Sequence, residues 1–357
     1  MIKVSPIFHI GIIGCGKMGR DLFDWLTGFP FAVTWVCRTA EQTEQFEEVF
    51  VKKQRRAIKY GLGDENTTRF RTVNTIITSD MEKLTHCDLV LETITEDIEC
   101  KRTLFHKLQQ ILPETCVIAS NTSSIPPDTL FKGLSNQKNC VGLHFFFPVA
   151  LKNFVEINTA ENTSKQAIST VENFLNRTER FYLKLSGNDQ FIINRLFLKM
   201  QAGCCRLIQE DLMDIREIDV LVKENLFPVG IFEFFDYVGN DVMLQSVRNY
   251  LAYEKDPDFY LPMIKMLEQK VKEGKLGKKT KTGFYDYPVK KISSKDLGVS
   301  TKREKILQQI IHWYLDGVFD VLQRKICSRK ELEFLVKEYM AVEQSPFDLA
   351  MKNGYKS

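Results

Sequence analysis

A single histidine, His144, stands where proton-transfer chemistry could be carried out. It lies at the edge of the aromatic run Phe145-Phe146-Phe147, and Glu156 follows it by twelve residues in another strand-like piece. A carboxylate that hydrogen-bonds an imidazole orients the ring and stabilises its charged form, which suits the ring to general acid or base catalysis. Alternatively, His144 could be a structural histidine and Glu156 an exposed strand carboxylate. The position of His144 after a series of alternating strands and helices favours the catalytic interpretation.

Hydroxyl side chains precede this histidine. The sequence Asn121-Thr122-Ser123-Ser124 follows the strand-like segment CVIASN at 116–121. In open parallel sheets, ligands bind outside the carboxyl ends of the strands. The hydroxyl groups of this segment are therefore predicted to reach a bound substrate.

A glycine-rich turn stands near the start of the chain. Gly14-Cys15-Gly16-Lys17-Met18-Gly19 is a G-x-G-x-x-G motif that directly follows the strand-like segment at 9–15 and opens a helical segment at 17–27. The first glycine allows a tight turn, the second lets the backbone approach a pyrophosphate, and the third permits close helix packing. The motif predicts dinucleotide binding, and a purely structural glycine turn is the alternative.

The end of the second strand, AVTWVC at 32–37, bears on the choice of cofactor. An acidic residue at this point would hydrogen-bond the ribose hydroxyls of NAD, but the sequence has Cys37 followed by Arg38. The missing carboxylate removes a repulsion against a 2′-phosphate, which the guanidinium of Arg38 could bind. NAD(H) or NADP(H) is predicted with a preference for NADP(H); the alternative is a solvated Arg38 and NAD held through its pyrophosphate.

Strands and helices alternate over the first half of the chain, which predicts an α/β fold with a Rossmann-type, doubly wound, mostly parallel sheet. Further strand-like segments occur at 74–78, 88–94, 141–146, 154–157 and 181–185, with helical stretches at 40–60 and from Lys101 to Leu112. From about residue 190 the pattern is helical. The predicted domains are a dinucleotide-binding domain at 1–187, a first helical copy at 188–290, and a linker with a second helical copy at 291–357.

An internal repeat at an offset of 114 residues supports two copies within the all-helical C-terminal part. Gly203 recurs as Gly317 and the segment LVKE at 221–224 recurs at 335–338; with one inserted residue, Phe232 and Gly239 match Phe347 and Gly354. Chance similarity between two amphipathic helix pairs is the alternative. The stretch at 288–304 has the polar composition of a linker.

Composition excludes several classes of protein. Of the 357 residues, 44% are hydrophobic and 27% are charged, and the formal net charge is +3. These values are typical of a globular protein and too evenly balanced for a dedicated nucleic-acid binder, and no segment is apolar enough for a membrane span. Nine scattered cysteines without a C-x-x-C pair and an N-terminus without secretory-signal order predict reduced thiols and a cytoplasmic location. The five histidines fall in no metal-ligand spacing.

Taken together, the motifs resemble the L-3-hydroxyacyl-CoA dehydrogenase family, which interconverts 3-hydroxyacyl and 3-ketoacyl thioesters. The resemblance covers most of the chain. It rests on the glycine motif, DLVLETITED at 88–97, NTSS at 121–124, GLHFF at 142–146, VEI at 155–157, FIINRL at 191–196, FEFFDYVG at 232–239 and LGKKTKTGFYDY at 276–287.

The resemblance implies a role for each matching position. It implies that His144 transfers the proton of the 3-hydroxyl, that Glu156 orients the imidazole, and that Ser123 and Asn194 bind the substrate oxygen and thioester region. The resemblance also implies that Glu96, Lys101 and Lys279 lie near the cofactor. The glycine motif and the end of the second strand supply the other predicted cofactor residues, which are Gly14, Gly16, Lys17, Met18, Gly19, Cys37 and Arg38. An isolated Asn194 could instead be a helix cap or a hinge residue.

The sequence departs from the family at three places: at Cys37, at Phe147 and at Asn188-Asp189-Gln190. Phe147 stands where the family usually has asparagine, so it is predicted to line an altered substrate pocket, and the third departure alters the hinge between domains. These changes leave room for an acyl group on an acyl carrier protein as the substrate, or for a dinucleotide-binding protein without turnover. The duplicated helical part predicts either a monomer, whose second copy takes a partner's place, or a homodimer.

Overall fold

A computed structural model describes residues 8–62, 64–187, 190–251, 254, 256–288 and 301–356 of the protein. The chain divides into two compact units, Met1–Gln190 and Phe191–Ser357. The division falls after Gln190, whereas the sequence pattern had placed it after Gly187. Asn188 and Asp189 of the predicted hinge, and residues 289–300 of the predicted linker, lie outside the described residues.

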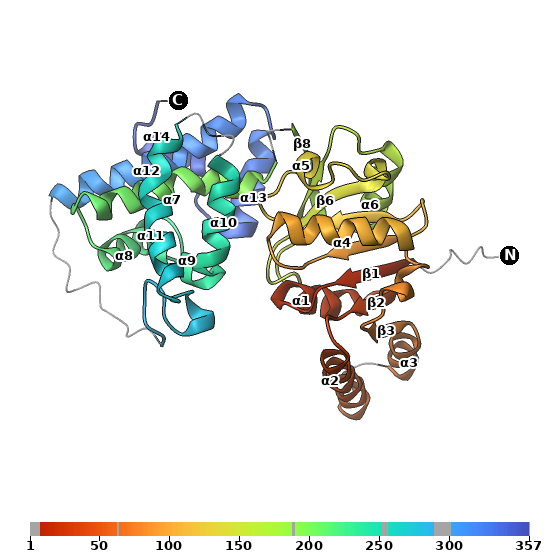
Figure 1. Ribbon diagram of the computed structural model, residues 1–357. Coiled ribbons are helices and arrows are strands. Elements are labelled where there is room, and N and C mark those ends of the chain that lie inside the picture. Colours follow the sequence, from red (N-terminus) through yellow and green to blue (C-terminus); the bar gives the residue numbers. More distant parts are fainter. Residues whose placement is uncertain are drawn as a thin grey trace. The chain divides into compact units, whose positions relative to one another are not determined.

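The first unit is built on one eight-stranded sheet, in which strands alternate with helices along the chain (Figure 1). The strand order is β3-β2-β1-β4-β5-β6-β7-β8. All neighbouring strands are parallel except β6 and β7, which are antiparallel. The strands are β1 (His9–Ile13), β2 (Ala32–Val36), β3 (Thr75–Thr78), β4 (Leu89–Glu92), β5 (Val117–Ser120), β6 (Cys140–Phe145), β7 (Phe154–Thr159) and β8 (Phe181–Ser186).

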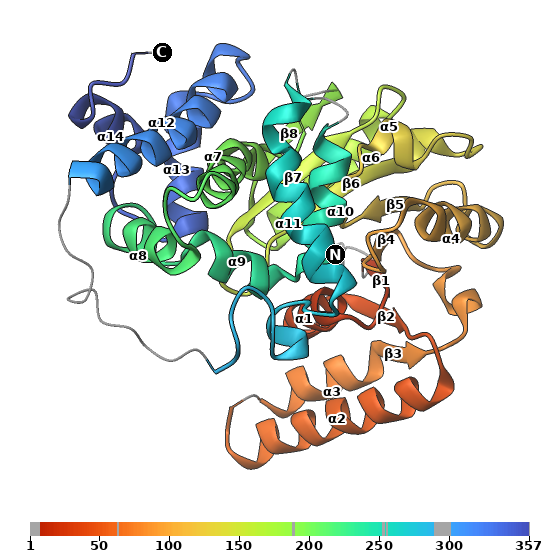
Figure 2. The ribbon, with the colours of Figure 1, turned by 60° about the vertical axis from the view of Figure 1, so that its left-hand side comes forward.

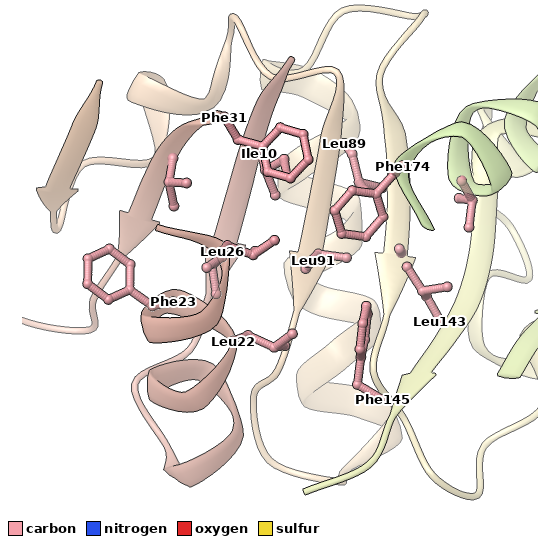
Figure 3. Close-up of a cluster of buried hydrophobic side chains, with 14 of the residues drawn as sticks. Ile10, Leu22, Phe23, Leu26, Phe31, Leu89, Leu91, Leu143, Phe145 and Phe174 are labelled. Atoms are coloured by element: carbon pink, nitrogen blue, oxygen red, sulfur yellow. The ribbon is translucent and has the colours of Figure 1, made fainter. Parts of the chain in front are cut away.

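Helices cover both faces of this sheet, because successive residues of each strand point to opposite faces and most of both sets are apolar. Ile10 and Leu91 belong to the core under α1 (Lys17–Leu26) and α6 (Lys165–Arg177). Figure 3 shows Leu22 and Leu26 of α1, with Phe174 of α6, in this cluster. The opposite face packs against α4 (Ile98–Ile111) and α5 (Pro127–Leu130). The predicted Rossmann-type fold is confirmed.

The sequence pattern predicted no helix at α5, at α6 or between α2 (Ala40–Lys59) and β3. After α2 the chain turns and forms α3 (Glu65–Val73), which lies beside α2 (Figure 2). The side chain of Asp64 caps α3 by accepting a hydrogen bond from the Thr67 amide at 2.8 Å. The residues of α3 are mostly polar, so the sequence shows little of the apolar periodicity that is typical of a helix. The capping residue Asp64 is the main sequence signal of its start.

The second unit is helical, as predicted. Its described helices are α7 (Ile192–Gln209), α8 (Ile215–Asn225), α9 (Ile231–Val238), α10 (Asn240–Leu251), α11 (Leu261–Lys272), α12 (Thr301–Gln323), α13 (Arg329–Met340) and α14 (Pro346–Lys352). The helices α7 and α12 pack against each other. No helix among the described residues combines the length and the apolar character needed to cross a membrane.

Helix boundaries in this unit recur at the 114-residue offset. The helices α7 and α12 end at Gln209 and Gln323, and each is followed by a residue in the left-handed conformation, Asp211 (φ 53°) and Lys325 (φ 57°). The next helices, α8 and α13, both begin with a capping box at equivalent positions. The triplets α7-α8-α9 and α12-α13-α14 are therefore built on the same local pattern.

Candidate active site

The glycine loop between β1 and α1 has the geometry of a pyrophosphate cradle. Gly14 adopts φ +117°, and a Cβ on Gly19 would lie 2.1 Å from the carbonyl oxygen of Gly14, so both positions require glycine. A Cβ on Gly16 would meet nothing within 4 Å, and Gly16 gives α1 no side-chain cap. Open space beside uncapped helix amides fits the phosphates of a dinucleotide.

Two predicted cofactor residues extend from this loop. The ammonium of Lys17 lies over the ring of Phe147, 3.8 Å from its centroid. Met18 is partly buried against the core beneath α1. The structure thus brings the loop lysine together with Phe147, the residue that departs from the family pattern, although a contact of Lys17, Met18 or Phe147 with a ligand stays a prediction.

At the end of β2 the structure places no carboxylate at the position that would bind ribose hydroxyls. The Cys37 side chain is buried, and burial together with the neighbouring Cys15 thiol raises the pKa of Cys37 to about 12, so this position carries no negative charge at neutral pH. Arg38 is exposed, directly before the Thr39 side chain that caps α2.

A buried ionic network lies at the carboxyl end of β4. The ammonium of Lys101, only 1% exposed, lies 2.6 Å from Glu92 Oε1 and 3.4 Å from Glu96 Oε2. Burial alone lowers the pKa of Lys101, but the charges of Glu92 and Glu96 outweigh it and raise the pKa above its usual value. In this structure Lys101 holds the two carboxylates in place, and its predicted contact with a cofactor stays a prediction.

Glu96 fixes the loop that follows β5. Its Oε1 accepts hydrogen bonds from the Thr122 hydroxyl (2.6 Å), the Ser123 amide (2.9 Å), the Ser124 amide (3.1 Å) and the Ser124 hydroxyl (2.9 Å). Burial raises the pKa of Glu96, but Lys101 and these donors outweigh it and hold the pKa below its usual range. An ionised, immobile Glu96 therefore presents Ser123 at the carboxyl edge of the sheet.

His144 and Glu156 form a direct pair across two strands. They are register partners in the antiparallel pairing of β6 and β7, and His144 Nδ1 lies 2.7 Å from Glu156 Oε2. His144 is 6% exposed and Glu156 is fully buried, so the interpretation of Glu156 as an exposed strand carboxylate is wrong. Directly opposed side chains on one face of an antiparallel pair are close enough to interact, which explains the short contact.

Asn121 connects the serine loop to the histidine strand. Its Oδ1 accepts a hydrogen bond from the amide of Phe145, the residue after His144, at 2.8 Å. Because β5 and β6 are parallel, their carboxyl ends lie at the same edge of the sheet, where the antiparallel β7 begins. Ser123, His144 and Glu156 thus gather at the edge that also carries the glycine loop.

Two predicted site residues belong to the second unit. Asn194, in the first turn of α7, hydrogen-bonds the hydroxyl of Tyr250 through its side-chain amide. The ammonium of Lys279 forms an ion pair with Asp241 at 2.5 Å. Within that unit both side chains are held by neighbours, and their contacts with substrate or cofactor stay predictions.

Comparison with known proteins decides the family. The NAD-binding domain of 3-hydroxyacyl-CoA dehydrogenase matches residues 9–187, and the C-terminal domain of the same family matches residues 191–287. The chain belongs to the 3-hydroxyacyl-CoA dehydrogenase family. The predicted family is confirmed, and with it an oxidoreductase whose first domain binds a nicotinamide dinucleotide.

Relatives in the 3-hydroxyacyl-CoA dehydrogenase family agree with this assignment. The chain is 31% identical to the mitochondrial hydroxyacyl-coenzyme A dehydrogenase of Homo sapiens over 294 residues, 80% of this chain and 93% of the relative. It is 26% identical to 3-hydroxybutyryl-CoA dehydrogenase of Clostridioides difficile, over 78% of this chain and 99% of the relative.

Solved structures of the family extend the similarity to the fold of nearly the whole chain. The 3-hydroxybutyryl-CoA dehydrogenase of Escherichia coli has a TM-score of 0.78, with 17% identity, over 98% of this chain and 92% of that one. The (S)-3-hydroxybutyryl-CoA dehydrogenase of Ralstonia eutropha has a TM-score of 0.69, with 26% identity, over 80% of this chain and 100% of that one. The former match, which shows the fold alone, includes residues beyond 287.

Sequence reasoning missed several residues that shape this family site. The Glu92–Lys101 contact gave no signal, because the eight residues between the two span a strand end and a helix start whose geometry is set by packing. Asn121 gave a weak signal as the first residue of the NTSS segment. Phe146, whose ring centroid lies 4.3 Å from that of the His144 imidazole, was visible only as part of an aromatic run.

Proposed function

We propose that this chain interconverts 3-hydroxyacyl and 3-ketoacyl thioesters of coenzyme A, with hydride passing between substrate C3 and a nicotinamide dinucleotide. The observation that carries the proposal is the buried His144–Glu156 pair, with 2.7 Å between Nδ1 and Oε2, at the sheet edge that bears Ser123 and the glycine loop. Membership in the family supports the acyl-CoA substrate, since its relatives are named for that class.

The proton chemistry follows from which ring nitrogen of His144 contacts Glu156. Glu156 binds at Nδ1, which fixes the tautomer and assigns proton exchange with the substrate to Nε2. In oxidation Nε2 removes the proton of the 3-hydroxyl, and Glu156 stabilises the resulting imidazolium; in reduction the same proton returns to the oxygen at C3. A bound nicotinamide ring supplies the hydride acceptor or donor. Ser123 and Asn194 hold the substrate oxygen and thioester region.

NADP(H) is the preferred cofactor in this proposal. The neutral, buried Cys37 neither binds the 2′-hydroxyl of NAD nor repels a 2′-phosphate, and Arg38 supplies an exposed guanidinium next to it. Lys17, Met18, Glu96, Lys101 and Lys279 complete the proposed surroundings of the cofactor. A reducing, cytoplasmic compartment is part of the proposal, supported by nine cysteines that are all free thiols.

The test is absorbance at 340 nm with acetoacetyl-CoA, run in parallel with NADH and NADPH. We expect oxidation of both with a lower KM for NADPH, and a decrease in kcat of about 10²- to 10⁴-fold in His144→Gln, since that is the usual contribution of a positioned general acid or base. Unchanged dinucleotide affinity and thermal unfolding of His144→Gln serve as the control for folding.

Other outcomes distinguish the alternatives. Turnover by His144→Gln at the wild-type rate contradicts the proposed acid/base role. Absence of turnover with either cofactor, despite measurable dinucleotide binding, favours an acyl-carrier-protein substrate; absence of turnover with that substrate as well favours a non-catalytic dinucleotide-binding protein.

A further inference from the structure

A second arginine lies beside the end of β2, although it comes from a different element than Arg38. Arg20 is the residue after Gly19, in the first turn of α1. Its Nε donates a hydrogen bond to the carbonyl oxygen of Cys15 at 3.1 Å, and its guanidinium lies over the ring of Phe46, 4.6 Å from the centroid. The side chain is therefore held between the glycine loop and α2.

The charge of Arg20 reaches the position where a ribose-binding carboxylate is missing. The Cys37 thiol interacts with the Cys15 thiol and with the hydroxyl of Thr43. The positive charge of Arg20 acts on the same thiol and lowers its pKa, although burial outweighs this effect. Cys15 connects Arg20 with the end of β2. Its backbone carbonyl accepts a hydrogen bond from Arg20, and its thiol donates to the carbonyl of Val36 at 3.9 Å. Arg20 thus lies beside the end of β2, and Arg38 follows residue 37 directly in the chain.

Among the described residues, no carboxylate forms an ion pair with Arg20 or with Arg38. Asp24, one turn after Arg20 on α1, is instead bound by Lys53 at 2.8 Å. Within the part of the chain that the structure describes, the terminal nitrogens of Arg20 make no hydrogen bond. Nearby, the N-terminus of the 20-residue helix α2 adds its positive dipole end.

We propose that Arg20 is a specificity-determining residue of the cofactor site, which binds the 2′-phosphate of NADP(H) together with Arg38. A phosphate monoester carries about 1.5 to 2 negative charges at neutral pH and accepts several hydrogen bonds, so it matches two guanidinium groups that approach from different elements. NAD(H) has a hydroxyl at this point and leaves both guanidinium groups unpaired. The inference rests on the NADP(H) preference proposed above.

The experiment compares three adenosine phosphates by isothermal calorimetry. 2′,5′-ADP carries the ribose phosphate of NADP, 5′-AMP lacks it, and 3′,5′-ADP carries the ribose phosphate of coenzyme A. We expect the wild-type protein to bind 2′,5′-ADP more tightly than 5′-AMP. Arg20→Ala should weaken 2′,5′-ADP by about 10- to 100-fold, the range for losing hydrogen bonds to a charged group, and leave 5′-AMP within about twofold.

Two further variants control for charge and geometry. Arg177→Ala removes another exposed arginine that lies over a phenylalanine ring, 4.8 Å from the centroid of Phe31, which precedes β2. Because this ring lies at the amino end of the strand, we expect Arg177→Ala to leave all three affinities unchanged. Arg20→Lys keeps the charge but loses the planar fork, so its affinity for 2′,5′-ADP should fall between those of the wild type and Arg20→Ala.

Each other outcome overturns a distinct claim. Equal weakening of 2′,5′-ADP and 5′-AMP by Arg20→Ala would show that Arg20 only supports the glycine loop through Cys15, and weakening confined to 3′,5′-ADP would assign Arg20 to coenzyme A. A wild-type protein that does not distinguish 2′,5′-ADP from 5′-AMP overturns both the NADP(H) preference and the role of Arg20. The proposed hydride transfer is tested separately by the 340 nm assay.

Discussion

Glu96 is the residue on which the position of the serine loop depends. One carboxylate oxygen receives four hydrogen bonds of 3.1 Å or less from Thr122, Ser123 and Ser124, while the other faces the ammonium of Lys101. A neutral amide in its place would keep part of this geometry, but it would leave the buried lysine with one carboxylate instead of two. Glu96 acts on the chemistry by positioning Ser123.

Replacement of Glu96 by glutamine should therefore destabilise the fold and make it less sensitive to acid. We expect the free energy of unfolding at pH 7 to decrease by about 3 kcal/mol, the lower end of the range for breaking a buried ion pair. The folded-state pKa of Glu96 is below its ordinary value of 4.5, so its contribution is complete above about pH 4.5 and is lost as the pH falls through the folded-state pKa.

Urea unfolding between pH 7 and pH 3.5 measures both effects. The difference in free energy of unfolding between wild type and Glu96→Gln should become smaller below about pH 4.5. Glu99→Gln, which changes an exposed carboxylate in the same helix as Lys101, should cost less than about 1 kcal/mol at any pH. A difference between wild type and Glu96→Gln that stays constant across this range would contradict the assignment.

At the scale of elements, two glycines allow α7 and α12 to pack closely. A Cβ on Gly203 of α7 would lie 2.2 Å from the ring of Trp313 on α12, and a Cβ on Gly317 of α12 would lie 2.7 Å from the carbonyl oxygen of Leu196 on α7. These glycines are equivalent in the 114-residue repeat. Each helix thus makes its close approach to the other at the same position of the 114-residue repeat.

We expect Gly203→Ala to destabilise the protein although alanine is the better helix former. Overpacking against Trp313 should cost about 1 to 3 kcal/mol and exceed the gain of about 1 kcal/mol in helix propensity. The combination with Trp313→Leu, measured by a double-mutant cycle in urea, should recover part of the loss because leucine leaves room for the added methyl group. Independent, additive effects would show that the ring does not limit the approach of α7.

At the scale of the whole molecule, the repeat bears on assembly. Helix α12 packs against α7 from within the same chain, and the apolar residues that α12 buries include Ile310, Ile311, Leu315 and Val318. An isolated first copy would expose the surface of α7 that now packs against α12. The repeat therefore supports a monomer in which the second copy takes the place of a partner chain.

Light scattering coupled to size exclusion tests this assembly. We expect the mass of one chain for the full-length protein, and aggregation or self-association after deletion of residues 301–357, since large apolar surfaces seldom remain exposed on monomers. A full-length dimer that survives the deletion unchanged would contradict the proposed pseudo-dimer and favour the homodimer.

Several features of this protein arise from residues that lie close together in the chain. The glycine loop, the alternation of strands and helices, the helical second unit and the repeated capping boxes depend on contacts within a few residues of each other, so local pattern and turn chemistry specify them. Motif order was enough to predict the family. Of the candidate site, His144, Glu156 and Ser123 were predictable as a set, because His144 and Glu156 lie in strands of one sheet and Ser123 follows another strand of it.

Tertiary structure alone decided which of these groups touch. The antiparallel β7 places Glu156 opposite His144, and a shift of one residue in that register would turn the carboxylate to the other face of the sheet. Packing likewise buried Lys101 between two carboxylates, and it brought Cys15, whose carbonyl binds Arg20, beside Val36 at the end of β2. Such contacts join residues that are 5 to 21 positions apart, and the balance of burial and charge that fixes them exists only once strands and helices have packed.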